Sequence, residues 1–322
     1  MKNKLSNIVA FFVLATLCLC KQTSMAQQDH LLEKGMSSHF GQTNDGVQMH
    51  YVKVGSGPKL LVMAHGFPEF WYGYFPLLKQ FIDSKEFTVI APDLRGYNLT
   101  DKPEGVKPYQ VINLVNDLTG LVKNLGYSKF TLVGHDWGGI VCWWLAIVHP
   151  ESLEKLIIIN SPHPLVFARE MRENPAQQAA NTYTQMFRAE GSEEKIMAND
   201  FEILINMMMS DGLKSGVFTE ETKKIYREAW SRPGALTGGL NWYRASSQYG
   251  PGYDLKAFDV RVPTLVIWGM EDEFILSSNL NGLDGFVDDL TIIEIHKGSH
   301  WVIHEMPQRV YQEISKFLLS SE

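Results

Sequence analysis

The sequence has little cysteine, no excess of positive charge and no apolar run of membrane-spanning length. Two of its three cysteines, Cys18 and Cys20, lie close to the N-terminus, so Cys142 has no internal disulfide partner in the rest of the chain. Packing alone must therefore stabilise the fold. The 36 acidic residues outnumber the 29 basic ones. The resulting net charge of -7 argues against a nucleic-acid-binding surface.

The N-terminal segment is typical of an export signal. Lys2 and Lys4 precede an apolar run over residues 8–20, and small residues follow it at Ser24 and Ala26. We expect cleavage between Ala26 and Gln27, and hence a periplasmic or secreted protein. A span needs about twenty apolar residues, so an uncleaved membrane anchor is the less favoured alternative.

The remaining chain has the composition of a globular protein, with 45% hydrophobic and 20% charged residues in 322. Apolar β-branched runs alternate with longer amphipathic segments, which predicts a doubly wound, mostly parallel sheet of the α/β class. Strands are expected at residues 49–54, 59–64, 88–91, 130–133, 155–160, 264–268 and 291–295. Helices are expected at residues 111–125, 138–149 and 307–319.

One long segment contains no strand-like run. Residues 164–250 are helical in pattern and carry Pro and Gly at both edges, so we interpret them as an inserted helical cap. The predicted organisation is a signal peptide at 1–26, a core in two parts at 27–163 and 251–322, and the cap between them.

The strongest chemical signal is the sequence VGHDWGG at residues 133–139, between a predicted strand and a predicted helix. Glycines on both sides of one residue permit the sharp turn of a nucleophile elbow, and that residue is Asp136 instead of serine. A carboxylate attacks a saturated carbon that bears a leaving group and forms an ester that water later cleaves. The alternative is that Asp136 only caps the helix N-terminus.

A base and an acid follow in the chain order of a hydrolase triad. His300 would activate water, and Asp272 would fix the His300 tautomer, although Glu271 and Glu273 flank that aspartate.

A metal site is the alternative interpretation of this region. His296, His300 and His304 are spaced by four, which on a helix is typical of metal ligands. The strand-like residues before them and Gly298 argue against that helix, so we expect neither a metal nor a cofactor, and we interpret His296 and His304 as ordinary strand-end and surface residues.

The loop after residues 59–64 is expected to complete the site. We assign the oxyanion hole to the backbone amides of Phe67 and Trp137. His65 and Trp71 are predicted to contact substrate, with packing as the alternative for the aromatic residue.

The cap supplies two candidates for the leaving group. An opened epoxide is an alkoxide that needs a proton or a strong hydrogen bond, and a tyrosine phenol meets that need. Tyr183 and Tyr243 lie in the predicted cap, where packing is the alternative role for each of them.

Taken together, these motifs resemble the α/β-hydrolase epoxide hydrolases. The similar segments extend over nearly the whole chain from about residue 49 and lie at residues 65–72, 93–97, 134–139, 160–164, 232–236, 240–244 and 299–301. The resemblance implies a nucleophilic role for Asp136, with His300 as base and Asp272 as its acid. It also implies that Tyr183 and Tyr243 hold the epoxide oxygen.

The function predicted from the sequence is therefore hydrolysis of a small-molecule epoxide to a vicinal diol by a monomer or homodimer. Haloalkane dehalogenases are similar in fold, and in such an enzyme Trp137 would form half of a halide site. The other alternative is a non-catalytic secreted protein that binds a small apolar ligand. The tyrosine pair favours the epoxide.

Overall fold

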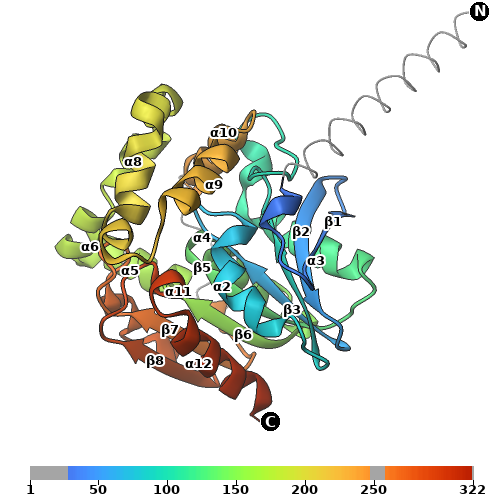
Figure 1. Ribbon diagram of the computed structural model, residues 1–322. Helices are drawn as coiled ribbons and strands as arrows, with labels where there is room; N and C mark the ends of the chain where they lie inside the picture. The colour runs from blue at the N-terminus through green and yellow to red at the C-terminus, as the bar shows by residue number, and fades with distance from the viewer. Residues whose placement is uncertain (1–27, 247–257, 321–322) are drawn as a thin grey trace, which may run out of the picture.

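The structure, a computed structural model, describes residues 28–246 and 258–320. Within them, eight strands form a single sheet in the order β1-β2-β4-β3-β5-β6-β7-β8 (Figure 1). β2 pairs antiparallel with β1 and β4, and all other pairs are parallel. The strands are β1 (Ser37–Gln42), β2 (Gln48–Gly55), β3 (Lys59–Ala64), β4 (Phe87–Pro92), β5 (Phe130–His135), β6 (Leu153–Ile159), β7 (Thr264–Gly269) and β8 (Leu290–Ile295).

The central strands are apolar because helices cover both faces of the sheet. Every residue of β5 and β7 is buried, which explains their nearly continuous apolar sequences. α3 (Val111–Asn124) and α4 (Asp136–Val148) pack together in one layer. α2 (Phe75–Leu78), α11 (Val302–Glu305) and α12 (Pro307–Leu319) form the other (Figure 1). The α/β class and the doubly wound sheet are thus confirmed.

The predicted strands and helices agree with the structure to within two residues at nearly every boundary. β1 is a strand that the pattern did not indicate, because it is a polar edge strand whose residues are only partly buried. The short helices α2 and α11 were not predicted either. β1 pairs with β2 from Ser37 opposite Lys53 to Gln42 opposite Gln48. Edge strands are short and polar in many proteins and so lack the apolar alternation that reveals a strand.

The inserted helical cap lies between β6 and β7. It comprises α5 (Pro164–Glu173), α6 (Pro175–Ala180), α7 (Tyr183–Arg188), α8 (Ser192–Ser215), α9 (Glu220–Trp230) and α10 (Ala235–Ser246) (Figure 1). α8 leaves the helical conformation at Ala198 and at three left-handed residues after it. The predicted breaker at residues 250–252 lies outside the described residues.

The cap packs on the loops that follow β3 and β4. The Trp230 indole donates to the carbonyl oxygen of Pro68 at 2.6 Å, and the Trp242 indole donates to that of Arg95 at 3.0 Å. Both carbonyls follow the carboxyl ends of parallel strands, which is the edge where α/β proteins place their sites. Within residues 28–246 and 258–320, no helix combines the length and the apolar character needed to cross a bilayer.

Candidate active site

Asp136 stands at the sharp turn from β5 into α4. Its backbone is left-handed, with φ of 51°. The turn has no room for side chains at its glycines, because a Cβ on Gly138 would lie 2.1 Å from the carbonyl oxygen of Ala64 and one on Gly134 would lie 2.6 Å from the Gly139 Cα. Ser161 Oγ donates to the Asp136 carbonyl oxygen at 2.7 Å. A strained backbone held by its surroundings in this way is typical of functional positions.

The Asp136 carboxylate does not cap its own helix. Its Oδ1 accepts a hydrogen bond at 2.8 Å from the backbone amide of Phe67, in the loop after the neighbouring strand β3. A Cβ on Gly66 would lie 2.2 Å from the same oxygen, so a side chain at that position would displace it. Among the described hydrogen bonds of this carboxylate, the Phe67 amide is a donor and the Trp137 amide is not.

The loops after β7 and β8 bring His300 and Asp272 to the same place. His300 Nδ1 lies 2.7 Å from Asp272 Oδ2. The backbone amides of Phe274 and Ile275 donate to Asp272 Oδ1 at 2.8 and 2.9 Å. This carboxylate only accepts, so Nδ1 of His300 carries a proton. The flanking carboxylates that made this position ambiguous, Glu271 and Glu273, are exposed.

His300 contacts Asp136 on its other side. Its Nε2 lies 3.6 Å from Asp136 Oδ2. Burial lowers the pKa of the His300 imidazole, but the carboxylates of Asp272 and Asp136 outweigh burial and raise that pKa to about 10. The imidazole between two carboxylates is therefore protonated at neutral pH.

Asn160 is a supporting residue that the sequence did not single out for a role. It follows β6 with φ of 41°, a left-handed conformation that asparagine tolerates better than most residues. Its Nδ2 donates to Asp272 Oδ2 at 2.7 Å, and its Oδ1 accepts from the Gly269 amide at 2.9 Å. The signal for this residue was its position at the carboxyl end of a predicted strand, next to the site.

The two cap tyrosines lie near each other and near the elbow. The ring centroids of Tyr183, on α7, and Tyr243, on α10, are 6.4 Å apart. Tyr243 makes edge-to-face contacts with Phe67 at 5.3 Å and with Trp137 at 5.0 Å. Burial raises the pKa of both phenols above the ordinary value, and the Asp136 charge adds to the rise. Both therefore keep their protons at neutral pH and act as hydrogen-bond donors.

Two predicted substrate contacts lie in the protein interior instead. The His65 ring is fully buried, its Nδ1 lies 2.8 Å from the Gly66 carbonyl, and its Nε2 accepts from the Leu94 amide at 3.0 Å. Trp71 is also fully buried, and its indole donates to Gln28 at 3.4 Å. The predictions for both residues need correction, because His65 has no free nitrogen for a ligand and Trp71 packs in the core.

The three histidines of the metal hypothesis do not share a helix. His296 follows the end of β8, His300 precedes α11, and His304 lies within α11. In the described ranges, no group of three histidine, cysteine or acidic side chains has the geometry for a metal ion. His304 is not an ordinary surface residue, because its ring is mostly buried and lies 2.6 Å from Glu69.

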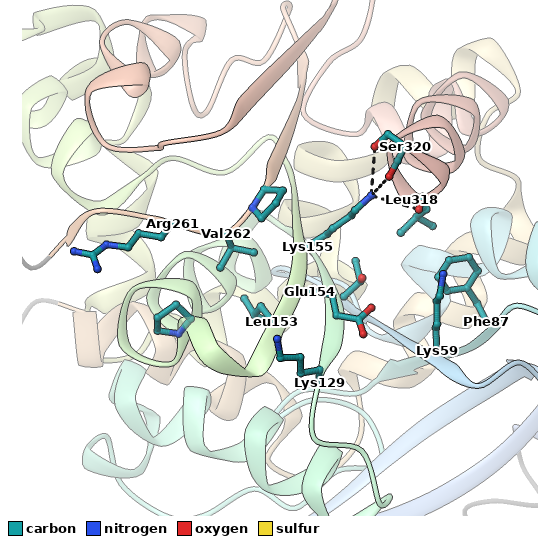
Figure 2. Close-up of a pocket in the computed structure, with 13 residues that line it drawn as sticks. Lys59, Phe87, Lys129, Leu153, Glu154, Lys155, Arg261, Val262, Leu318 and Ser320 are labelled. Carbon is teal, nitrogen blue, oxygen red and sulfur yellow. Dashed lines mark hydrogen bonds between the residues drawn. The ribbon is translucent and has the colours of Figure 1, made fainter. Parts of the chain in front are cut away.

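A cavity of about 530 Å³ lies at the opposite end of the sheet (Figure 2). Its lining includes Lys59 and Leu153, which begin β3 and β6, and Lys155, whose ammonium group donates to Ser320 O at 2.8 Å. None of the candidate catalytic residues Asp136, Asp272, His300, Tyr183 and Tyr243 lines this cavity. The amino ends of parallel strands are also not where α/β proteins bind their substrates.

A parallel sheet with a nucleophile elbow, a histidine after its last strand and an acid after the preceding one defines the α/β hydrolases. Residues 59–307 match the family model described as the alpha/beta hydrolase fold. An α/β-hydrolase superfamily protein of Bacillus subtilis is 40% identical over 292 residues, covering 88% of this chain and 98% of that protein. Human epoxide hydrolase 4 is 37% identical over 284 residues, covering 85% of this chain and 76% of that protein.

Solved structures agree with these relatives. An epoxide hydrolase of Bacillus megaterium in complex with an inhibitor superposes with a TM-score of 0.81 at 31% identity, covering 88% of this chain and 100% of that chain. Another structure of that enzyme, a mutant, holds its product, a naphthyloxy-propane-diol. The chain belongs to the epoxide hydrolase family of α/β-hydrolase enzymes.

Proposed function

We propose that this protein hydrolyses an epoxide to a vicinal diol through a covalent ester on Asp136. The observation that carries the proposal is one continuous arrangement of groups. The Phe67 amide holds one oxygen of Asp136, and the other oxygen faces His300, which Asp272 orients. Two protonated phenols on the cap lie near the same carboxylate.

In the first step, Asp136 Oδ2 attacks a carbon of the epoxide ring. The carbon–oxygen bond of the ring breaks, and the oxygen takes a proton from Tyr183 or Tyr243 while the other phenol donates a hydrogen bond. Oδ1 becomes the carbonyl oxygen of the ester, already next to the Phe67 amide. This division of labour follows from the contacts, because Oδ1 is held by an amide and Oδ2 is not.

The first step also prepares the base for the second. Asp136 loses its charge on becoming an ester, so the carboxylate support for the His300 proton is reduced and the pKa of His300 falls from about 10. His300 returns a proton to the phenolate and becomes neutral, without net exchange with solvent. It then deprotonates a water that attacks the ester carbonyl carbon, and the diol leaves as Asp136 is regenerated.

The tetrahedral intermediate of the second step carries its negative charge on Oδ1. The Phe67 amide is a donor 2.8 Å from that atom before the reaction, as an oxyanion hole requires. We propose the Trp137 amide as the second donor, formed when the carboxylate reorients on esterification.

The test is mass spectrometry of His300→Ala protein mixed with styrene oxide, because blocking the second step leaves the ester in place. We expect a mass gain equal to the whole epoxide, mapped to Asp136, and no gain in Asp136→Ala protein. If no epoxide gives an adduct but a haloalkane gives an alkyl adduct and free halide, the protein is a dehalogenase. Absence of any adduct would favour a binding protein.

We also propose that residues 1–26 direct export and are removed, and that residues 164–250 form the cap as a unit. The Gln28 side chain is buried, accepts from Asn98 at 2.9 Å and contacts Trp71. Cleavage after Ala26 keeps this interaction. N-terminal sequencing of the exported protein checks the position: a start at Gln27 supports it, and an intact Met1 in the membrane fraction contradicts it.

A further inference from the structure

A second buried carboxylate lies next to the triad and has no role in the steps above. Glu69, in the loop after β3, is 2% exposed. Its Oε1 accepts from the Tyr226 hydroxyl at 3.1 Å and lies 2.6 Å from His304 Nε2, and its Oε2 lies 3.2 Å from His135 Nδ1. We call these four residues the Glu69 cluster. They come from the elbow strand β5, from α11, from cap helix α9 and from the loop that carries Phe67.

Charge balance within the cluster keeps Glu69 ionised. Burial raises the pKa of the Glu69 carboxyl, but His304 and His135 outweigh burial and hold that pKa well below its ordinary value. The site is also closely packed, because a Cβ on Gly73 would lie 2.5 Å from Glu69 Oε1. Burying a carboxylate without partners costs several kcal/mol of folding free energy. The hydrogen bonds to His304, His135 and Tyr226 are therefore required for a charged Glu69 to be buried here.

His135 connects this cluster to the base. Its Nε2 lies 2.9 Å from the main-chain carbonyl oxygen of His300, and its Nδ1 faces Glu69. A carbonyl and a carboxylate oxygen both only accept hydrogen bonds, so the His135 ring has an acceptor at each of its two nitrogens. His135 also immediately precedes Asp136 in the chain. One ring thus fixes the main chain of the base relative to the nucleophile.

We infer that Glu69 and His135 are positioning residues that set the distance between His300 and Asp136. We also infer that Tyr226, through its hydrogen bond to Glu69, makes this distance depend on the position of the cap. The inference rests on the proposed function. The His300 side chain is held at Nδ1 by Asp272, and its main chain is held by His135. Losing the second contact lets the ring pivot about Asp272, and a misplacement of about 1 Å costs roughly a hundredfold in rate.

The two chemical steps depend on this setting to different extents. Ring opening uses Asp136 and the phenols and needs no proton transfer from water to His300. Ester hydrolysis needs His300 at the correct angle to a water molecule. Disturbing the cluster should therefore slow the second step more than the first, whereas a general loss of structure would slow both steps together.

The experiment is quenched-flow mass spectrometry with styrene oxide on Glu69→Gln, which keeps the size of the side chain and removes its charge. We expect ester formation within about threefold of the wild-type rate and ester hydrolysis slower by roughly ten- to a hundredfold, so that the Asp136 ester accumulates. The matched control is Glu170→Gln. Glu170 is a buried carboxylate that accepts hydrogen bonds from Asn174 and Ser278 and from none of the proposed catalytic residues. This control should lower the melting temperature without accumulation of ester.

A second variant covers the case in which Glu69→Gln does not fold. His135→Asn keeps a donor at the position of Nδ1 for Glu69 but is too short to contact the His300 carbonyl as well, and we expect the same accumulation of ester. Tyr226→Phe removes only the cap contact and should give a smaller accumulation. The inference is overturned if both steps are slowed equally. It is also overturned if the ratio of ester formation to ester hydrolysis is unchanged in both the Glu69 and His135 variants. Absence of an ester in His300→Ala protein refutes the proposed function instead.

Discussion

The Nε2 atom of His300 lies 3.6 Å from Asp136 Oδ2, whereas Nδ1 of the same ring lies 2.7 Å from Asp272 Oδ2. The shorter contact is a charge-assisted hydrogen bond, and the longer one is a charge contact beyond hydrogen-bond distance. The ring is thus held by Asp272 and only attracted by Asp136. In the proposed mechanism, this asymmetry leaves the Asp136 Oδ2 atom without a strong hydrogen bond, so little has to be broken when it bonds to carbon.

Replacing Asp136 by alanine is expected to abolish turnover and to keep the fold. The carboxylate makes one described backbone hydrogen bond, with the Phe67 amide, so its loss affects few contacts. We expect diol formation to fall about a thousandfold or more, with an unchanged far-ultraviolet circular dichroism spectrum. Diol formation at the wild-type rate by the variant would rule out Asp136 as nucleophile.

Replacing Tyr243 by phenylalanine is expected to slow ring opening by roughly a hundredfold, because general acid assistance is worth about that much. The single-turnover rate of ester formation measures this effect. Tyr97→Phe is the matched control, because the Tyr97 hydroxyl is buried and has no hydrogen-bond partner in the described structure. That control should react at nearly the wild-type rate. Equal rates in both variants would remove the Tyr243 phenol from the mechanism.

The stability of the free enzyme is expected to fall as the pH rises from about 7 toward 10. The carboxylates of Asp272 and Asp136 raise the pKa of His300 to about 10 in the folded protein, from an ordinary value of 6.5. The folded state therefore binds this proton more tightly than the unfolded state does. The stabilisation is fully present below about pH 6.5 and is lost as the pH rises through the folded value.

The measurement is the free energy of unfolding by urea between pH 6 and 9.5, compared between wild type and His300→Gln. The wild-type curve should decline more steeply with pH, and the difference isolates His300 from other titrating groups. Parallel curves would contradict a charged imidazole between Asp136 and Asp272.

Much of the fold and part of the site could be predicted because the relevant signals are local in sequence. The strands were visible as buried apolar runs, and the elbow was visible as glycines around Asp136. The cluster around Glu69 has no such signal, because its members are spread between residues 69 and 304 and meet only in the folded chain. His304 was for that reason interpreted as a surface residue.

The wrong predictions have a common physical origin. A motif next to a site contains residues that contact substrate and residues that hold the loop, and the sequence does not distinguish the two. His65 bonds to backbone at both ring nitrogens, and Trp71 fills the core. Conversely, burial selects Asp272 over Glu271 and Glu273, which the sequence left open. The roles assigned to the remaining site residues stay predictions until the variants are measured.

Asn160 offers a way to separate support of the triad from backbone strain. Its side chain bonds to Asp272 and Gly269, and its φ of 41° is unfavourable for residues with a Cβ. Asn160→Gly removes the side-chain bonds and suits the backbone, whereas Asn160→Ala removes the same bonds and adds strain. Both variants remove the same hydrogen bond to Asp272 Oδ2. Turnover should therefore fall by the same factor in both, roughly tenfold for a bond worth about 1.5 kcal/mol. The Asn160→Ala variant should be less stable to unfolding than Asn160→Gly by roughly 1 kcal/mol.

Steady-state turnover measures the activity of the two variants, and urea unfolding measures their stability. If activity instead follows stability across the two variants, the effect of Asn160 on the triad is exerted through the backbone and not through its bond to Asp272.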